Sequence, residues 1–337
     1  MIRDRDALAH DLALDCVEAG VTAAQPERVV RDRVTVTDES LQIDDATYPL
    51  DDYDDVVVVG GGKAAAHVAA VLEDLFGDRL TGGVVVTNDP VSTDRVDVVE
   101  ASHPVPDERG VEGATNVIET AGRADENTLL LAVFTGGGSA LLPAPADGLS
   151  LTDLQSVTEQ LLRSGASIDD VNAVRKHCSA LKGGRLARTA APARVVTLLV
   201  SDVVGDDPAV VASGPTAPDP TTFADALAVL DDYDVDAPDA VRHHLERGAD
   251  GDRRETPTAD DPIFDAVSTH VLANGWTALD AASETASAAG YEPLVLSSRI
   301  EGEAREGAKT HAAIATEIVE TGNPVEPPAV VLSGGET

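Results

Sequence analysis

The chain has 337 residues, of which 43% are apolar and 3% aromatic, a composition typical of a globular protein with room for about two domains. Its 60 acidic residues outnumber the 24 basic residues, so the formal net charge is −36. A surface this acidic repels phosphate backbones and anionic lipid headgroups, which excludes nucleic acids and membrane surfaces as main partners.

Lysine is rare in this chain, with only four among the 24 basic residues. A dense carboxylate surface with few lysines is typical of proteins from a salt-rich cytoplasm, where salt screens the repulsion between charges. We therefore expect a halophilic source and a cytoplasmic location, and the charged N-terminus has no apolar core of a signal peptide. Cys16 and Cys178 fit no metal spacing and are expected to be buried free thiols.

Hydrophobic periodicity predicts helices and strands in alternation. In chain order we expect a helix over 6–20, a strand over 56–59, a helix over 63–76, a strand over 83–87, a helix over 116–123, a strand over 129–135, helices over 152–164 and 171–188, a strand over 195–200, the start of a new unit at 269–272, a helix over 278–288, a strand over 294–296, a helix over 303–321 and a strand over 329–332. This alternation predicts an α/β fold with a mainly parallel sheet.

A polar, charged and proline-containing stretch at residues 248–262 is typical of a linker. We expect it to separate an N-terminal α/β domain of residues 1–247 from a second α/β domain that begins at residue 263 and runs to 337. The last predicted strand leads into a glycine-rich turn at residues 333–337, which usually feeds another element. The second domain is therefore expected to be incomplete in this chain.

Three glycine clusters follow predicted strands, namely Gly60–Gly62, Gly136–Gly138 and Gly334–Gly335. Ligands in open α/β sheets bind at the carboxyl ends of the strands, and glycine lets the backbone approach an anion closely. A tight strand-to-helix turn explains any one of these clusters. Three together favour an anion-binding cleft.

Charged residues gather in the same segments. Lys63 follows the first glycine cluster, Lys176 lies between Arg175 and His177, and Lys182 precedes Gly183-Gly184-Arg185, which predicts a positive pocket for an anionic substrate. Asp202 and Asp206 follow the strand predicted at 195–200. Carboxylates in this position can hold Mg²⁺ or accept a proton from a hydroxyl group.

Common nucleotide motifs match poorly. The phosphate-binding loop that ends in Gly-Lys-Ser/Thr is absent, because Ala64 follows Lys63. A degenerate dinucleotide fingerprint does fit, and it consists of Gly60, Gly62 and Ala65 with Asp89 near the end of the next strand. This match keeps an NAD(P)-dependent dehydrogenase as an alternative.

Other candidate residues have simpler explanations. Ser139 is not expected to be a nucleophile, because Leu141 stands where a hydrolase elbow needs glycine. His103 lies in a proline-rich turn, which explains it without a ligand, although contact with a substrate is an alternative. His243 and His244 are expected on an exposed helix without a specific role.

The sequence resembles the class II glycerate 2-kinase family, whose C-terminal part is called the MOFRL domain. The matching segments are GGGKAAA at 60–66, SHPVPD at 102–107, TGGGSALL at 135–142, NAVRKHCSALKGGRLA at 172–187, SDVVGDDPAVVASGPT at 201–216, DPTT at 219–222 and SGGET at 333–337. The chain departs from the family in its acidity and in ending at SGGET, which in the family opens a longer segment.

This resemblance implies transfer of a phosphoryl group from ATP to the 2-hydroxyl of D-glycerate, giving 2-phosphoglycerate, with Mg²⁺ as cofactor. It also implies two α/β domains, the first a Rossmann-like sandwich around a parallel sheet, with the active site in the cleft between them. Phosphoryl transfer needs mainly positioning and positive charge around the moving group, which fits the lysines and glycines found here.

The resemblance suggests a role for each candidate residue. Lys63 would stabilise the transferred group beside the amides of Gly61 and Gly62, and Asp202 or Asp206 would hold Mg²⁺ or orient the substrate hydroxyl. The glycerate carboxylate or a phosphate would be bound by residues from two further segments: Gly136, Gly137, Gly138, Ser139, Arg175, Lys176, Lys182 and Arg185. A non-catalytic sugar-acid-binding module is a second alternative, and a homodimer remains a hypothesis.

Overall fold

The computed structural model describes residues 2–336, with side chains from residue 8 onward. Its α-helices are α1 (Ile2–Ala23), α2 (Pro26–Arg33), α3 (Ala65–Phe76), α4 (Glu108–Ala121), α5 (Gly138–Leu141), α6 (Leu151–Ser164), α7 (Ile168–His177), α8 (Arg185–Ala190), α9 (Phe223–Asp232), α10 (Asp239–Ala249), α11 (Gly275–Ala288) and α12 (Ala304–Thr321). Its strands are β1 (Val34–Val36), β2 (Ser40–Ile43), β3 (Ala46–Pro49), β4 (Asp55–Gly61), β5 (Leu80–Thr87), β6 (Val96–Glu100), β7 (Thr128–Thr135), β8 (Arg194–Val200), β9 (Val267–Ala273), β10 (Glu292–Glu301) and β11 (Ala329–Glu336).

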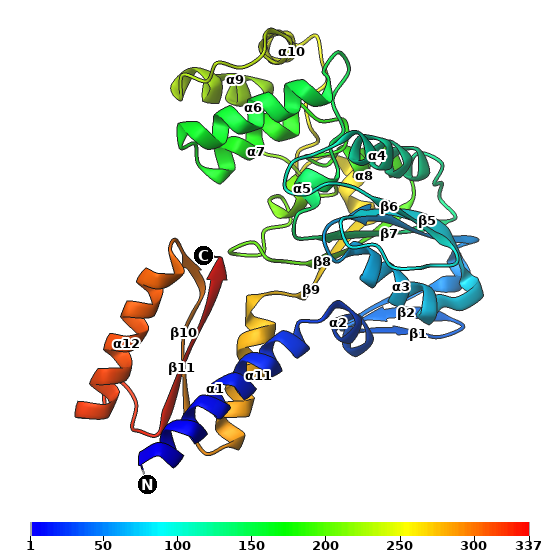
Figure 1. Cartoon of the computed structure of the whole chain (residues 1–337). Helices are drawn as coiled ribbons and strands as arrows, with labels where there is room; N and C mark the ends of the chain where they lie inside the picture. The colour runs from blue at the N-terminus through cyan, green and yellow to red at the C-terminus, as the bar shows by residue number, and fades with distance from the viewer. Residues whose placement is uncertain (1, 337) are drawn as a thin grey trace. The chain divides into compact units, whose positions relative to one another are not determined.

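The chain folds into two compact units, which Figure 1 shows in chain colours. The larger unit consists of Arg33–Val200 and Asp207–Val271. The smaller unit consists of the N-terminal segment up to Asp32, the loop Ser201–Asp206, and the chain from Leu272 onward.

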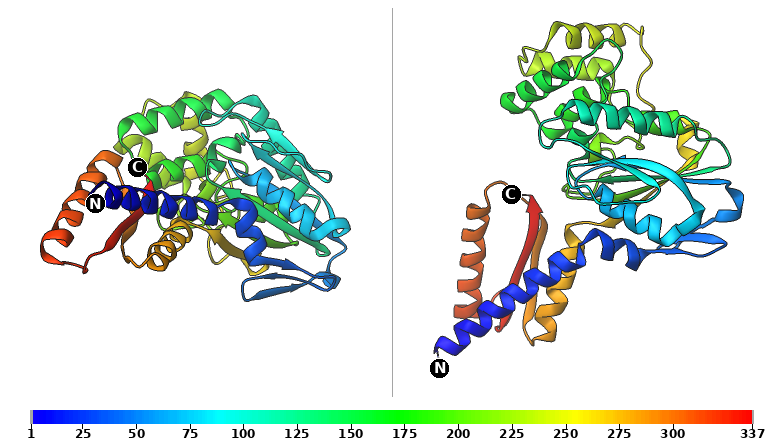
Figure 2. Two further views of the ribbon diagram at one scale, coloured as in Figure 1. Left: turned by 60° about the horizontal axis from the view of Figure 1, so that its bottom comes forward. Right: turned by 45° about the vertical axis from the view of Figure 1, so that its right-hand side comes forward.

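A six-stranded sheet forms the centre of the larger unit, with the strand order β6-β5-β4-β7-β8-β9. The pairs from β6 through β8 are all parallel. Every residue of β7 is buried, as expected for a central parallel strand that is covered on both faces. Helices α3 and α4 lie on opposite faces of this sheet (Figures 1 and 2).

A helical layer of the larger unit is formed by α6, α7, α9 and α10 (Figure 1). Its core includes Leu161, Val174, Cys178, Phe223 and Leu245, each less than 2% exposed. Both cysteines of the chain are buried and free, as the sequence predicts. This layer fixes the end of α7, where several of the predicted site residues lie.

The smaller unit is built around the parallel pair β10 and β11. Helix α11 contacts both strands, and α1 packs along α11 (Figure 2). The close contact of the two helices needs a small residue, because a Cβ on Gly20 would lie 2.9 Å from the carbonyl oxygen of Ala278. Leu12, Cys16, Ala282 and Ala286 form the buried core between them.

The unit boundaries differ from those expected from the sequence. Residues 248–262 belong to the larger unit and do not form a linker. They are held there because Gly248 packs against the Phe223 ring and the Glu255 carboxylate accepts from the Phe223 amide at 3.1 Å. Residues 263–271 continue into β9 of the large sheet, and the N-terminal helix α1 belongs to the smaller unit.

Most predicted elements are confirmed, but the helix expected over 171–188 is wrong. The structure divides it into α7, which ends at His177, and α8, which begins at Arg185. A continuous helix is prevented because Gly183 and Gly184, between the two, adopt φ angles of +58° and +75°, outside the right-handed helical region. The sequence analysis also missed α2, α5 and α9 and the strands β1, β2, β3 and β6. The helix expected at His243 and His244 is α10. In the described part of the chain, we find no helix long and apolar enough to cross a membrane.

Candidate active site

The first glycine cluster is explained largely by packing at the end of β4. A Cβ on Gly60 would overlap the carbonyl oxygen of Val133, and a Cβ on Gly62 would overlap Oγ1 of Thr135, both on β7. The Gly62 amide donates to the carbonyl of Val86 at 3.0 Å. The phosphate role expected for the Gly62 amide therefore finds no support in this geometry, since that donor already has an acceptor.

The second glycine cluster brings together residues from three segments. Gly137 has a φ of +80°, and a Cβ there would lie 2.9 Å from Cδ2 of His103 and 3.1 Å from Cγ of Lys63. The main-chain amide of Lys63 donates to the carbonyl of Gly136 at 2.8 Å. The turns that follow β4 and β7 are thus joined at the carboxyl edge of the sheet, where α/β proteins bind ligands.

A cavity of about 290 Å³ opens beside Gly137 within the larger unit. Its polar lining side chains include those of His103, Ser139, Thr158, Arg175, Ser179 and Lys182. Pro143, Leu154 and Leu162 supply part of the apolar wall. The structure therefore brings Gly137, Ser139, Arg175 and Lys182 together around one cavity.

Two of these residues are cations with no carboxylate partner among the residues that the structure describes. The Lys182 ammonium is 95% buried and donates to the carbonyl oxygen of Leu142 at 2.7 Å. Burial, and then the charge of Arg175, lower the pKa of Lys182 to about 7. Burial also lowers the pKa of the Arg175 guanidinium. Two neighbouring positive charges in one cavity favour an anion between them.

Ser139 is oriented by a chain of hydrogen bonds. Ser213 Oγ donates to Asn172 Oδ1 at 2.9 Å, and the Oγ atoms of Ser139 and Ser213 lie 2.8 Å apart. Because a hydroxyl has one proton, the bond to Asn172 leaves Ser213 to accept from Ser139. The lone pairs of Ser139 are then available to accept a hydrogen bond in the cavity, which suits a substrate hydroxyl better than an anion.

The turn that carries Ser213 has an unusual backbone. Ala212 and Ser213 adopt φ angles of +51° and +60°, followed by Gly214 at +62°. Non-glycine residues in this region cost free energy and persist where the surrounding structure holds them. Here the turn brings Ala212 against Gly138, on which a Cβ would lie 2.8 Å from the Ala212 Cβ.

Two basic residues expected at the site lie elsewhere. Lys176 is buried and forms an ion pair with the fully buried Asp219 at 3.2 Å. Arg185 donates to the carbonyl oxygen of Lys176 at 2.7 Å and lines a different cavity. Neither residue lines the cavity beside Gly137, so the structure gives both of them roles in the interior of the α7–α8 region.

The predicted carboxylates Asp202 and Asp206 belong to the smaller unit. Asp206 has a φ of +56°, and its Oδ2 accepts from Nδ2 of Asn274 at 2.7 Å. Asp202 is exposed. Where the structure describes side chains, no three His, Cys, Asp or Glu residues gather as a metal cluster. Mg²⁺ needs only one or two carboxylates when phosphates and waters complete its shell, so these two residues fit that cation.

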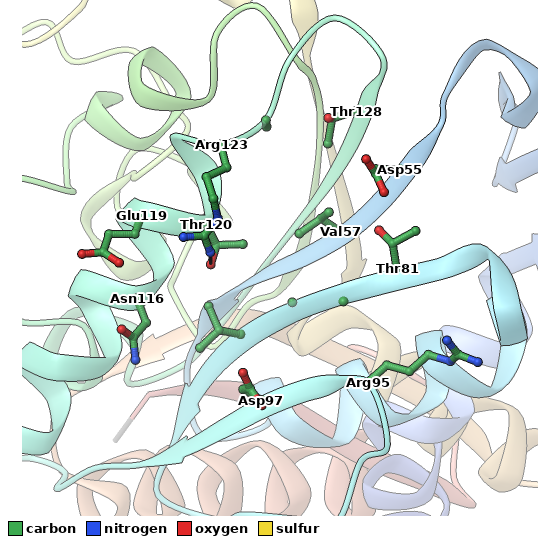
Figure 3. Close-up of a pocket in the computed structure, with 14 residues that line it drawn as sticks. Asp55, Val57, Thr81, Arg95, Asp97, Asn116, Glu119, Thr120, Arg123 and Thr128 are labelled. Carbon is green, nitrogen blue, oxygen red and sulfur yellow. Dashed lines mark hydrogen bonds between the residues drawn. The ribbon is translucent and has the colours of Figure 1, made fainter.

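A larger cavity of about 560 Å³ lies at the opposite edge of the sheet (Figure 3). It is lined from the amino ends of β4, β5, β6 and β7, with Asp55, Thr81, Asp97 and Thr128 among its residues. Arg123 there donates to Thr120 Oγ1 at 3.0 Å. In the part of the chain that the structure describes, no buried cation without a carboxylate partner lines this cavity, and its glycines Gly82 and Gly83 lie within β5 and not in a turn after a strand. We do not assign the active site to it.

His103 is the main site residue that the sequence analysis did not select. Its ring contacts Gly137 and lines the cavity, whereas its proline-rich segment suggested only a stiff turn. Ser179, Ser213 and Asn172 were missed as well. The signal for them was present in the sequence only as polar residues within the segments that match the family.

Comparison with known proteins decides the family. Residues 12–246 match a family described as "Domain of unknown function (DUF4147)". The glycerate 2-kinase of Pyrococcus horikoshii is 38% identical over 97% of this chain and 74% of its own length. The chain belongs to the glycerate 2-kinase family. The crystal structure of a Pyrococcus horikoshii protein matches at 38% identity with a TM-score of 0.85, covering 98% of this chain and 74% of that one.

Two further relatives extend this comparison. The crystal structure of the glycerate kinase of Thermotoga maritima matches with a TM-score of 0.82 at 33% identity, over 97% of this chain and 74% of that one. A protein of Agrobacterium vitis, provisionally named hydroxypyruvate reductase, is 45% identical over 83% of this chain. The chain spans 63% of the Agrobacterium protein's length and 74% of the Pyrococcus protein's length.

Proposed function

We propose that this protein transfers the γ-phosphoryl group of ATP to the 2-hydroxyl of D-glycerate and releases 2-phosphoglycerate and ADP. In this reaction the 2-oxygen bonds to the γ-phosphorus while the bond to the β–γ bridging oxygen breaks, and the hydroxyl proton is released. The relatives named glycerate 2-kinase support this proposal. The observation in this chain that carries it is that two cations, Arg175 and Lys182, line one small cavity with no carboxylate partner among the described residues.

The substrate carboxylate is the natural partner of these cations. An anion bound between Arg175 and Lys182 offsets the charge that burial makes costly. Arg175 offers a planar fork of donors that matches a carboxylate, and Lys182 offers a point charge. A carboxylate held there leaves the hydroxyl groups of glycerate near Ser139, whose lone pairs are available as acceptors.

The transferred phosphoryl group would be stabilised from the other side of Gly137. Lys63, the lysine of the turn that follows β4, contacts this glycine through its side chain. The first-turn amides of α5, at Gly138 and Ser139, have no carbonyl acceptor within their own helix and can donate to phosphate oxygens. Positioned positive charge and amide donors are the main requirements of phosphoryl transfer.

Asp202 and Asp206 are the residues that would hold Mg²⁺. When bound, Mg²⁺ would neutralise phosphate charge on the nucleotide. In this arrangement Asn274 orients the Asp206 carboxylate by donating to one of its oxygens. The other oxygen of Asp206 and the exposed Asp202 carboxylate then supply the oxygen ligands that Mg²⁺ prefers.

The proposal is tested by initial-rate measurement of ADP release with D-glycerate, ATP and Mg²⁺ in a KCl buffer. We expect Lys63→Ala to lower kcat by about 10²–10³, as loss of a transition-state cation does elsewhere. Normal turnover by a variant that combines Lys63→Ala, Asp202→Ala and Asp206→Ala would refute the proposed machinery. Binding of glycerate without any turnover by the wild-type protein would favour a sugar-acid-binding module instead.

A reductase acting on hydroxypyruvate is the second candidate, because the Agrobacterium relatives are provisionally named so. The fingerprint glycines offer it little support. Gly60 and Gly62 are required by the close approach of β7, and the Asp89 carboxylate lies 3.1 Å from Nε2 of His67. NADH or NADPH oxidation with hydroxypyruvate, in the absence of ATP and Mg²⁺, would identify this activity.

The acidic composition also supports two proposals about where this enzyme works: first that its surroundings are rich in salt, and second that it is cytoplasmic. A surface with 60 acidic and 24 basic residues stays hydrated where salt is concentrated, so we place the protein in a salt-rich cytoplasm. Loss of the fold when KCl is removed tests the first part of that proposal. Retention of the fold at low salt would contradict it.

A further inference from the structure

A second cavity in the larger unit has features of an anion site. Its volume is about 350 Å³, and His177, His244, Arg185, Arg253 and Arg254 are among its lining residues. It lies next to the cavity of the candidate active site, because Ser179 lines both. In a protein with a net charge of −36, three arginines around one small cavity are a local concentration of positive charge.

His244 presents an unpartnered nitrogen to this cavity. The side chain is 96% buried, and its Nε2 lies 2.9 Å from the carbonyl oxygen of His177. A carbonyl only accepts, so the Nε2 proton is donated to it. Nδ1 makes no hydrogen bond of normal geometry among the described residues, although the main chain of Asp147 lies near the ring and favours its protonated form. A buried polar atom without a partner costs free energy, which a ligand with a hydrogen-bonding group would recover.

The arginines are incompletely paired in the same way. Arg253 donates from Nη2 to the carbonyl oxygen of Asp147 at 3.1 Å, while its buried Nε has no partner among the described residues. Arg185 donates to a carbonyl oxygen and makes no ion pair in the described part of the chain. Arg254 lies 3.9 Å from the Asp261 carboxylate, a long ion pair.

The acidic residues nearby do not complete these charges. Asp252 pairs with Arg247 at 3.5 Å. Glu255 lies 3.2 Å from Nε2 of His177 and accepts from the Phe223 amide. Asp147 meets Arg253 through its main-chain carbonyl. Among the described residues, no carboxylate lies within ion-pair distance of the Arg185 or Arg253 guanidinium groups, although the Asp219 and Glu255 charges are near enough to attract Arg185.

We propose that this cavity is a second binding site for a small oxyanion, the phosphate or carboxylate group of a metabolite, held by Arg185, Arg253 and His244. The bound oxygen atoms accept from the Arg185 and Arg253 guanidinium groups. Nδ1 of His244 donates to the same anion when the ring takes up a second proton, because its Nε2 proton is already donated to the His177 carbonyl. Burial lowers the pKa of His244, and the charge of a bound anion offsets that cost. The site is separate from the proposed kinase reaction, and its occupancy does not depend on turnover.

The experiment follows the His244 ring signals by NMR during titration with inorganic phosphate, at constant ionic strength in KCl. The signals are assigned by their loss in His244→Gln. We expect phosphate to shift the His244 signals with saturation, and we expect at least tenfold weaker binding in Arg253→Gln. Arg242→Gln is the matched control. It also removes one arginine charge, but neither Arg242 nor its ion-pair partner Asp231 lines the cavity.

Two results would overturn the proposal. One is that the His244 signals do not move when phosphate is added to the folded wild-type protein, a result that needs no variant. The other is that Arg253→Gln and Arg242→Gln bind phosphate equally tightly at this site. A parallel titration with acetate shows whether the site prefers a phosphate or a carboxylate group. Weaker binding of either anion in Arg253→Gln supports the site.

Discussion

Replacing Lys182 by Met should make the protein more stable and its substrate binding weaker. The substitution keeps most of the length of the side chain and removes a charge that is 95% buried. Replacing a residue that serves only the fold lowers the free energy of unfolding of the protein. Replacing a charged group that is held in an apolar wall in order to bind a ligand should raise it.

The expected gain in stability follows from the pKa of Lys182. Burial and Arg175 lower this pKa from 10.5 to about 7. Each pKa unit corresponds to about 1.4 kcal/mol, so the charged ammonium costs the folded state about 5 kcal/mol below pH 7. Because the unfolded chain holds the proton more tightly, the cost fades as the pH rises from about 7 to 10.5. It is about 2 kcal/mol at pH 9.

The lost hydrogen bond to Leu142 offsets part of this gain. An unsatisfied buried carbonyl costs about 1–3 kcal/mol. Lys182→Met should therefore raise the free energy of unfolding by about 2–4 kcal/mol at pH 6, and by about zero at pH 9. Loss of a charged hydrogen bond should also weaken D-glycerate binding at pH 6 by about 10- to 100-fold.

Urea unfolding at pH 6 and pH 9 in constant KCl measures the first effect, and isothermal titration with D-glycerate measures the second. In the wild type, affinity for D-glycerate should fall as the pH rises above 7, since Lys182 loses its proton. In Lys182→Met that dependence should disappear. A variant that is less stable than wild type at pH 6 and binds D-glycerate normally would refute the reasoning.

Three further predictions concern the neighbouring residues. Arg175→Gln should raise the KM for D-glycerate at least tenfold with a smaller change in kcat, whereas Arg123→Gln at the opposite edge of the sheet should leave steady-state kinetics unchanged. Gly137→Ala and Gly148→Ala should each lower the free energy of unfolding, measured with urea, by about 1–2 kcal/mol, because both glycines have φ above +75°. Only Gly137→Ala should also lower kcat/KM, since only its Cβ meets other residues. Asp206→Asn should raise the Mg²⁺ concentration needed for half-maximal rate, and an unchanged Mg²⁺ titration would remove Asp206 from the metal site.

Local patterns predicted the elements that build the carboxyl edge of the sheet. The apolar run at 129–135 and the glycines after it identified β7 and the turn to Gly137, because a buried parallel strand has a continuous apolar sequence. The rarity of lysine made Lys182 conspicuous. These features depend on residues close together in the chain, which is why the sequence alone was sufficient for them.

Contacts between distant segments were not predictable in the same way. Lys176 and Lys182 look alike in sequence, but Asp219 neutralises the first and nothing acidic among the described residues pairs with the second. His244 was expected on an exposed face, and the structure buries it against His177 and Phe223. Neither outcome depends on local composition. Each depends on which group, more than 40 residues away in the chain, the fold places in contact with the residue.

The most direct test of the central claim is the identity of the product. The natural full-length polypeptide would be incubated with D-glycerate, ATP and Mg²⁺ in KCl, and phosphorus NMR would identify the phosphoglycerate while ADP is quantified. The account predicts 2-phosphoglycerate and ADP in equal amounts. Phosphorylation at the 3-position, or no ADP together with NADH-dependent reduction of hydroxypyruvate, would contradict it.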